Sequence, residues 1–113
     1  MARAARVLGD ACTLLILRDL GAGPRYYGEL LGSAAGNTRT LSSRLSRLVR
    51  LGLVERERLP GRPPRVRYAL SPVGTHLLPV VELLREFGTR WLPSGCDPLG
   101  EVSPSARGRE GMP

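Results

Sequence analysis

Residues 37–52 read Asn37-Thr38-Arg39-Thr40-Leu41-Ser42-Ser43-Arg44-Leu45-Ser46-Arg47-Leu48-Val49-Arg50-Leu51-Gly52. Leu41, Leu45 and Leu48 recur at the spacing of one apolar helical face. At about 100° per residue, the opposite face carries only arginine and hydroxyl side chains. These are Arg39, Thr40, Ser43, Ser46, Arg47 and Arg50. Asn37 is a favourable N-cap and Gly52 a favourable residue after a helix end, so the pattern predicts a helix over 38–51.

A helix with leucines on the face toward the core and arginines on the opposite, solvent-facing side is suited to insertion into the major groove of DNA. There, arginine can reach guanine edges or phosphates, and Ser or Thr can bond to either. The alternative is a solvated surface helix. No acidic residue occurs from Asn37 to Val54, so these arginines have no partners within the helix, which favours the DNA interpretation. The candidate DNA-binding residues of this segment are Asn37, Thr38, Arg39, Thr40, Ser42, Ser43, Arg44, Ser46, Arg47 and Arg50.

The positive charge of the chain is concentrated around this helix. The formal net charge is +7. Between Asn37 and Arg67 there are nine arginines and two glutamates, whereas the rest of the chain carries eight arginines and eight acids. A contiguous excess of this kind is the electrostatic footprint expected for polyanion binding.

Two strands joined by a Pro/Gly loop are predicted directly after the helix, over 53–58 and 65–70. In the second strand, Val66, Tyr68 and Leu70 alternate with Arg65, Arg67 and Ala69, which is the period of a strand with one polar face. A basic hairpin beside a basic helix indicates a wing, whose arginines would lie along phosphates or enter the minor groove. An ordinary edge ribbon is the alternative. The candidate DNA-binding residues of the hairpin are Arg62, Arg65 and Arg67.

The segments that flank this region predict further helices. Upstream, helices are expected over 2–8, 11–20 (capped by Asp10) and 27–31, with a single-bridge strand at 25–26. Residues 32–36 then form the turn of a helix-turn-helix. Downstream, Ser71-Pro72 is a strong helix start, and Pro79 should divide the following segment into a short and a longer helix that ends near Trp91.

The apolar face of that last helix is larger than so small a domain requires. Part of it is therefore expected to pack against a second subunit, and the alternative is that it packs on its own domain. A two-fold dimer would place two recognition helices about one DNA turn apart, on a palindromic operator. The predicted organisation is a winged helix-turn-helix domain over 1–92, mainly α with a small β-hairpin and with dimerisation helices at both ends. Residues 93–113 are rich in Pro, Gly and Ser and predict a disordered tail.

Several motifs resemble the HxlR-type family of bacterial winged helix-turn-helix regulators. They are GDACTLLILRDL at 9–20, GPRYYGEL at 23–30, TRTLSSRL at 38–45, LGLVER at 51–56, PPRVRYAL at 63–70 and SPVG at 71–74. The resemblance implies a homodimeric transcription factor with helices from both ends of the chain in the dimer interface. The chain departs from the family in having Cys12 where a tryptophan is usual and Thr38 where a proline is usual.

Nothing in the sequence favours an enzyme or a metal site. His76 is the sole histidine, with no acid within a helical turn, and Glu82 and Glu86 lack a histidine or cysteine at ligand spacing. No Gly-rich phosphate loop occurs, so no cofactor is expected. Cys12 on an apolar helical face is expected to be a small buried hydrophobic residue.

Double-stranded DNA is therefore the expected partner, in a cytoplasmic protein without a membrane span. The apolar run at 11–17 is too short to cross a bilayer. The live alternative is a winged-helix module whose basic face binds an acidic protein. RNA binding ranks last, because the basic segment offers only Tyr68 for base stacking. A small-molecule effector is possible, but the sequence identifies none.

Overall fold

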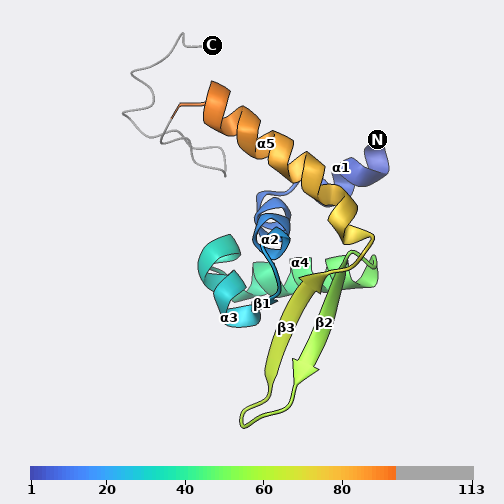
Figure 1. Cartoon of the computed structure of the whole chain (residues 1–113), viewed down its shortest axis with the longest axis vertical. Coiled ribbons are helices and arrows are strands. Elements are labelled where there is room, and N and C mark those ends of the chain that lie inside the picture. Colours follow the sequence, from blue (N-terminus) through green and yellow to red (C-terminus); the bar gives the residue numbers. More distant parts are fainter. Residues whose placement is uncertain (94–113) are drawn as a thin grey trace.

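The computed structural model describes residues 1–93, which form a helical body with a small three-stranded sheet (Figure 1). The body contains two short irregular helices in addition to its α-helices: a π-helix at Leu31–Ala35 and a 3₁₀-helix at Gly74–Leu77. The other elements are α1 (Ala2–Leu8), α2 (Ala11–Gly21), β1 (Arg25–Tyr26), α3 (Tyr27–Leu30), α4 (Thr38–Arg50), β2 (Val54–Leu59), β3 (Arg65–Leu70) and α5 (Leu78–Trp91).

The leucine stripe of α4 lies at the centre of the core. Leu41, Leu45 and Leu48 are at most 1% exposed, and they pack with buried apolar side chains of α2, α3 and the sheet. Those partners are Cys12, Ile16, Leu20, Leu30, Val54 and Tyr68. Burying a leucine fully contributes about 1.5–3 kcal/mol, so this stripe determines which side of α4 is turned to solvent.

Backbone hydrogen bonds end α4 at Arg50, one residue before the predicted end, with Gly52 just beyond the helix as predicted. The Leu53 amide donates to the Leu48 carbonyl, and the Gly52 amide donates to the Val49 carbonyl, both at 3.0 Å. This pair of bonds is a Schellman motif, which requires a left-handed residue after the helix. Gly52 has a φ of +75°, which glycine adopts without the strain that a side chain would cause.

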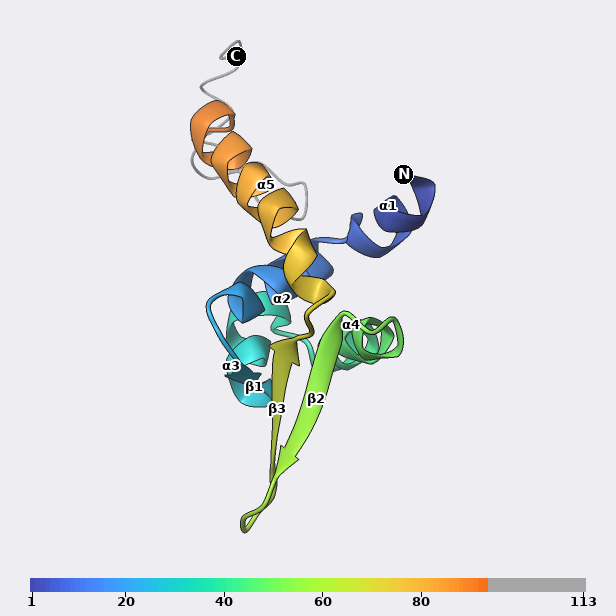
Figure 2. The same cartoon turned by 45° about the vertical axis from the view of Figure 1, so that its right-hand side comes forward.

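The hairpin is an extension of the sheet. The strand order is β1-β3-β2, all antiparallel, with Val54 opposite Leu70 and Leu59 opposite Arg65. Figures 1 and 2 show the hairpin projecting from one end of the body, with α1 and α5 at the other end. The sheet thereby holds the hairpin beside α4.

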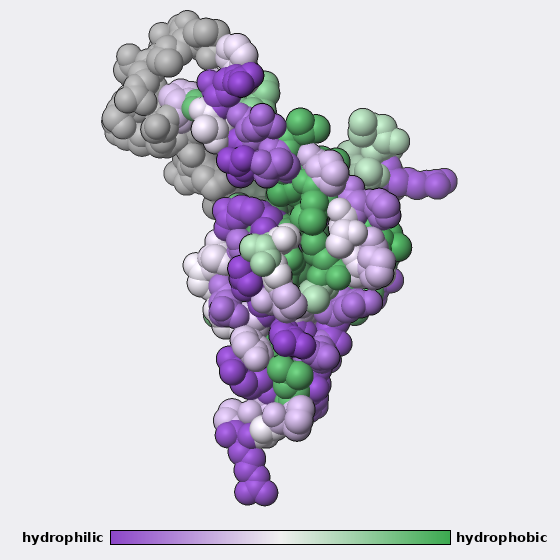
Figure 3. Space-filling model, in the orientation of Figure 1, coloured by the Kyte–Doolittle hydropathy of each residue, from purple (hydrophilic) through white to green (hydrophobic). Residues whose placement is uncertain are grey.

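The helix α5 leaves an apolar face open. No side chain of α5 is buried in the described chain, and Leu83 is 64% and Phe87 57% exposed. Val80, Leu84 and Trp91 are exposed on the same helix. Figure 3 shows a band of apolar side chains along α5.

Most predicted elements are present, with small shifts of their ends and one larger difference. The first strand of the hairpin is shifted by one residue, to Val54–Leu59, and α2 extends to Gly21. The helices α3 and α4 each end one residue earlier than predicted, at Leu30 and Arg50. The predicted turn at 32–36 is wrong in detail, because the chain continues α3 as the π-helix Leu31–Ala35 and only turns at Gly36, where φ is +65°. Pro79 lies in the first turn of α5, where proline needs no amide donor, and divides the segment as predicted. The predicted tail lies outside the described residues, apart from residue 93.

Gly74→Ala tests the contact between the hairpin's return segment and the end of α4. A Cβ at Gly74 would lie 2.0 Å from the Leu53 carbonyl oxygen, which is backbone and cannot rotate away. We expect the free energy of unfolding to fall by about 1–3 kcal/mol, measured by urea denaturation. Gly88→Ala in α5 is the matched control, because nothing lies within 4 Å of its Cβ, and it should be neutral or slightly stabilising. Equal stability of the two variants would contradict the packing.

Candidate nucleic-acid interface

The outer face of α4 presents arginine and hydroxyl groups to solvent. The Asn37 side chain caps the helix by accepting a hydrogen bond from the Thr40 amide at 3.1 Å, and Thr40 itself is half-buried. With the leucine stripe turned inward, the exposed residues are Thr38, Arg39, Ser42, Ser43, Ser46 and Arg50. These are the side chains of α4 that a duplex laid against this face would meet.

Tyr27 of α3 anchors the first turns of α4. Its hydroxyl lies 2.8 Å from the Ser42 hydroxyl and donates to the Thr38 carbonyl at 3.3 Å. The contact joins the two helices of the helix-turn-helix at the end where α4 begins. The start of the helix is thus held by both the Asn37 cap and the Tyr27 hydroxyl.

The wing carries its predicted arginines in three different environments. Arg62 is exposed in the loop between β2 and β3. The Arg65 guanidinium lies over the ring of Tyr26, 3.6 Å from the ring centroid. Arg67 forms an ion pair with Glu57 on the neighbouring strand. Arg62 therefore keeps its charge free, while Arg67 is partly neutralised.

A groove between α4 and the wing contains Arg56, which is not among the DNA-binding residues predicted from the sequence. The groove has a volume of about 440 Å³ and is lined by Ser42, Leu45, Ser46, Val49, Arg50, Arg56 and Tyr68. Arg56 lies two residues after Val54, which is buried, so strand alternation puts both side chains on the face that looks toward α4. The same alternation can be read from the sequence, and it would have identified Arg56 as a candidate site residue.

The interface has an excess of unpaired positive charge. Across residues 1–93, five exposed arginines of the interface have neither a carboxylate within 4 Å nor an aromatic ring against the guanidinium: Arg39, Arg50, Arg56, Arg58 and Arg62. All five are exposed, and they lie on α4 or on the wing. This arrangement attracts a polyanion over the whole face rather than at one residue.

Arg44 and Arg47 are not brought to this face. Arg44 forms an ion pair with Asp10, the N-cap residue of α2, and Arg47 donates to the Val7 carbonyl oxygen at 3.2 Å. Both side chains are half-buried. The expectation that Arg47 points away from the leucine stripe is wrong, because its long side chain curls back to acceptors on the α1–α2 junction.

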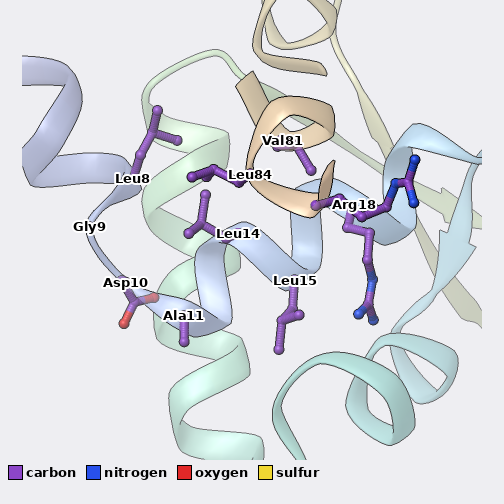
Figure 4. A pocket seen from close by; sticks show the side chains of 10 residues that line it. Leu8, Gly9, Asp10, Ala11, Leu14, Leu15, Arg18, Val81 and Leu84 are labelled. Carbon is purple, nitrogen blue, oxygen red and sulfur yellow. The ribbon is translucent and has the colours of Figure 1, made fainter. Parts of the chain in front are cut away.

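The same junction forms one wall of an apolar cavity of about 500 Å³ between α2 and α5 (Figure 4). The lining residues are Leu8, Gly9, Asp10, Ala11, Leu14, Leu15, Arg18, Val81, Leu84 and Arg85. Leu14 is half-buried against this space. Arg18 and Arg85 each pair with a neighbouring carboxylate, Asp19 and Glu82.

Other chemistry is sparse in the described part of the chain. No group of three or more His, Cys, Asp or Glu side chains among these residues could hold a metal ion, and His76 is exposed. Cys12 is 8% exposed, as expected for a small core residue, and burial raises the pKa of its thiol. Residues 1–93 contain no helix of the length and hydropathy that a bilayer crossing requires.

A helix-turn-helix whose second helix is basic, followed by a basic hairpin, defines the class of winged helix-turn-helix proteins. Within this class, the HxlR-like helix-turn-helix family model matches residues 7–95. The chain belongs to this family, which confirms the resemblance. Its relatives are transcriptional regulators and not enzymes.

Named relatives and a solved structure agree with this assignment. An uncharacterized HTH-type transcriptional regulator of Synechocystis sp., sll1512, is 37% identical, covering 76% of this chain and 64% of the relative. A second, MT3179 of Mycobacterium tuberculosis, is 38% identical over 80% of this chain and 58% of the relative. The chain thus spans about three fifths of their length. A MarR-family transcriptional regulator from Porphyromonas gingivalis W83 superposes with a TM-score of 0.76 at 30% identity, covering 80% and 90% of the two chains.

Asp10→Asn tests the ion pair to Arg44, because asparagine is as good an N-cap as aspartate but has no charge. Burial alone would raise the pKa of Asp10, but hydrogen bonds from Arg44 and Thr13 outweigh it and lower the pKa to about 2 from 3.8. A lowered pKa means stability that is present above about pH 4 and is lost as the pH falls toward 2. We expect the variant to be less stable by about 2 kcal/mol at pH 7 and equal to the parent near pH 2, by thermal unfolding. A difference that does not change with pH would contradict this assignment.

Proposed function

We propose that this chain is a sequence-specific DNA-binding transcriptional regulator that acts as a homodimer. The recognition helix α4 enters the major groove, and the wing of β2 and β3 lies on the backbone or in the minor groove. The observation that carries the proposal is the exposed arginine and hydroxyl face of α4 beside the wing, with five exposed and unpaired arginines on these two elements. Residues 1–92 form the DNA-binding domain of a cytoplasmic regulator.

The residues proposed to contact DNA fall into two groups by their position. On α4 they are Thr38, Arg39, Thr40, Ser42, Ser43, Ser46 and Arg50, with Asn37 holding the start of the helix. On the wing they are Arg56, Arg62, Arg65 and Arg67. The first group meets base edges and the adjoining phosphates of the major groove, and the second binds phosphates. Arg44 and Arg47 are not in the set, because their guanidinium groups bind groups on the α1–α2 junction.

The groove between α4 and the wing suits a phosphate strand. Arg50 and Arg56 lie on its two sides, one from the helix and one from β2, and Ser46 adds a hydroxyl. When a recognition helix enters the major groove, a phosphate backbone borders it on each side. A DNA backbone in this groove would contact positively charged side chains of both α4 and β2.

The open apolar face of α5 supports the homodimer. Leu83 and Phe87 lie on one side of the helix together with Val80, Leu84 and Trp91, all exposed in a single chain. A second copy would remove this face from water, and a two-fold axis would then place two α4 helices on the two halves of a palindromic operator. The helix α1, which buries no side chain, lies at the same end of the molecule as α5 (Figure 2).

Fluorescence anisotropy with the duplex upstream of the protein's own gene tests the function, with a scrambled duplex as control, across a salt series. We expect a preference for the upstream duplex that persists as salt rises, because base contacts do not depend on counterion release. Equal binding that collapses with salt would leave only a basic surface. Absence of binding at low salt would favour the acidic protein partner instead.

Arg39→Ala and Arg62→Ala should separate base reading from phosphate binding. Arg39 is exposed near the start of α4, so its loss should cost about 1–3 kcal/mol and reduce the preference for the upstream duplex. Arg62 is exposed in the wing loop, so its loss should weaken both duplexes equally and lower the salt slope by about one. Both are measured in the same anisotropy assay. Unchanged discrimination by the Arg39 variant would contradict the assigned face.

Leu83→Asp tests the dimer. The side chain is 64% exposed in one chain, so a charge there should leave the fold intact while preventing burial against a second copy. Sedimentation velocity should report a monomer, and binding to the upstream duplex should weaken. Glu82→Gln on the same helix is the control and should remain dimeric. A monomeric Leu83 variant that binds like the parent would show that dimerisation does not matter for DNA binding.

A further inference from the structure

We propose that Arg44 and Arg47 are positioning residues that fix the recognition helix to the α1–α2 junction, so that the position of this junction sets the orientation of α4. The proposal rests on the proposed DNA-binding function of α4. It assigns to the α1–α2 junction, at the opposite side of α4 from the wing, control over how the recognition helix meets DNA.

Arg44 holds the carboxylate of Asp10 with two hydrogen bonds. Its Nε donates to Oδ2 at 2.9 Å and its Nη2 donates to Oδ1 at 3.2 Å, across 34 positions of sequence. The side chains are 31% and 27% exposed. A two-point arginine–carboxylate pair fixes direction as well as distance, and partial burial protects it from salt screening.

Arg47 joins the same network one turn later in α4. Its Nη2 donates to the Thr13 hydroxyl at 3.3 Å as well as to the Val7 carbonyl at 3.2 Å. The Thr13 hydroxyl in turn donates to Asp10 at 2.8 Å, and Thr13 is fully buried. The chain of contacts runs without a gap from α4 through the first turn of α2 to the end of α1.

These bonds change what the two arginines can do. The guanidinium nitrogens with which Arg44 would donate to a guanine already donate to Asp10. The Nε of Arg47 is buried and has no hydrogen-bond partner among the described residues. Arg39 and Arg50, on the same helix, are exposed and free of carboxylates in the described chain. The four arginines of α4 are thus divided into two that face DNA and two that face the protein.

The junction is well placed to transmit a displacement. The helix α1 buries no side chain completely, and it contacts the body through the partly buried side chains of Val7 and Leu8 and through the Val7 carbonyl. Asp10 binds α4 through its carboxylate and also lines the cavity beside α5. A displacement of α1 relative to α2 therefore acts on Arg47 directly, and on Arg44 through Thr13 and Asp10.

A double-mutant cycle of Asp10→Asn and Arg44→Met is the first arm of the test, with binding to the upstream duplex as the readout. We expect each single variant to weaken binding about tenfold and the double variant by the same tenfold, because both remove one shared interaction. The salt slope should stay unchanged in all three. Arg62→Met, the same substitution at an exposed arginine of the wing loop, is the matched control and should lower the slope by about one.

If Arg44 contacted DNA, the outcome would differ in two ways. Arg44→Met would then lower the salt slope by about one, and Asp10→Asn would free the guanidinium and leave binding unchanged or tighter. Either result overturns the proposal, as does additivity of the two substitutions.

Amide hydrogen exchange without DNA is the second arm. Asp10→Asn, Arg44→Met and Arg47→Met should each speed exchange in α1 and α4, whereas Arg39→Met should not. Unchanged exchange in the first three variants overturns the proposal. If the parent protein shows no preference for the upstream duplex, the DNA-binding function fails, and this arm still decides whether the junction holds α4.

Discussion

Burial of the leucine stripe of α4 is the constraint on which the rest of this structure depends. Leu41, Leu45 and Leu48 fill the space between α2, α3 and the sheet, so rotating α4 would expose all three to water. That cost determines the outward face of the helix, including the exposed Arg39 and Arg50. The proposed DNA-binding surface is therefore a consequence of core packing, and not of any attraction among the arginines themselves.

Arginine serves two purposes on this one helix. Where acceptors lie within reach, at the α1–α2 junction, its forked guanidinium binds several of them at once, as Arg44 does with Asp10. Where none lies near, the charge stays free for a polyanion. The difference is set by what α2 and α1 present to each side of α4, so the same residue type stabilises the body and attracts the ligand.

The two ends of the molecule differ in the way expected of a dimeric DNA reader. The wing end carries exposed charge, with Arg62 in its loop and Arg58 on β2. The α5 end exposes apolar side chains such as Leu83 and Phe87. The wing end is stabilised by contact with an anion, and the α5 end is stabilised by burial of its apolar side chains away from water. A second copy and a DNA duplex would therefore bind to different residues and would not compete.

Local pattern was enough to predict the element types, the end of α4 just before Gly52, the basic face and the wing, because periodicity, capping and strand alternation act between near neighbours in sequence. It could not predict the π-helix at Leu31–Ala35 or the roles of Arg44, Arg47 and Arg56. A helical wheel treats each side chain as pointing straight out, whereas Arg44 meets Asp10 across 34 positions and Arg47 reaches Val7 across 40. Only the packing of α1 and α2 against α4 brings those acceptors within reach, so the division between free and bound arginines was decided by tertiary structure.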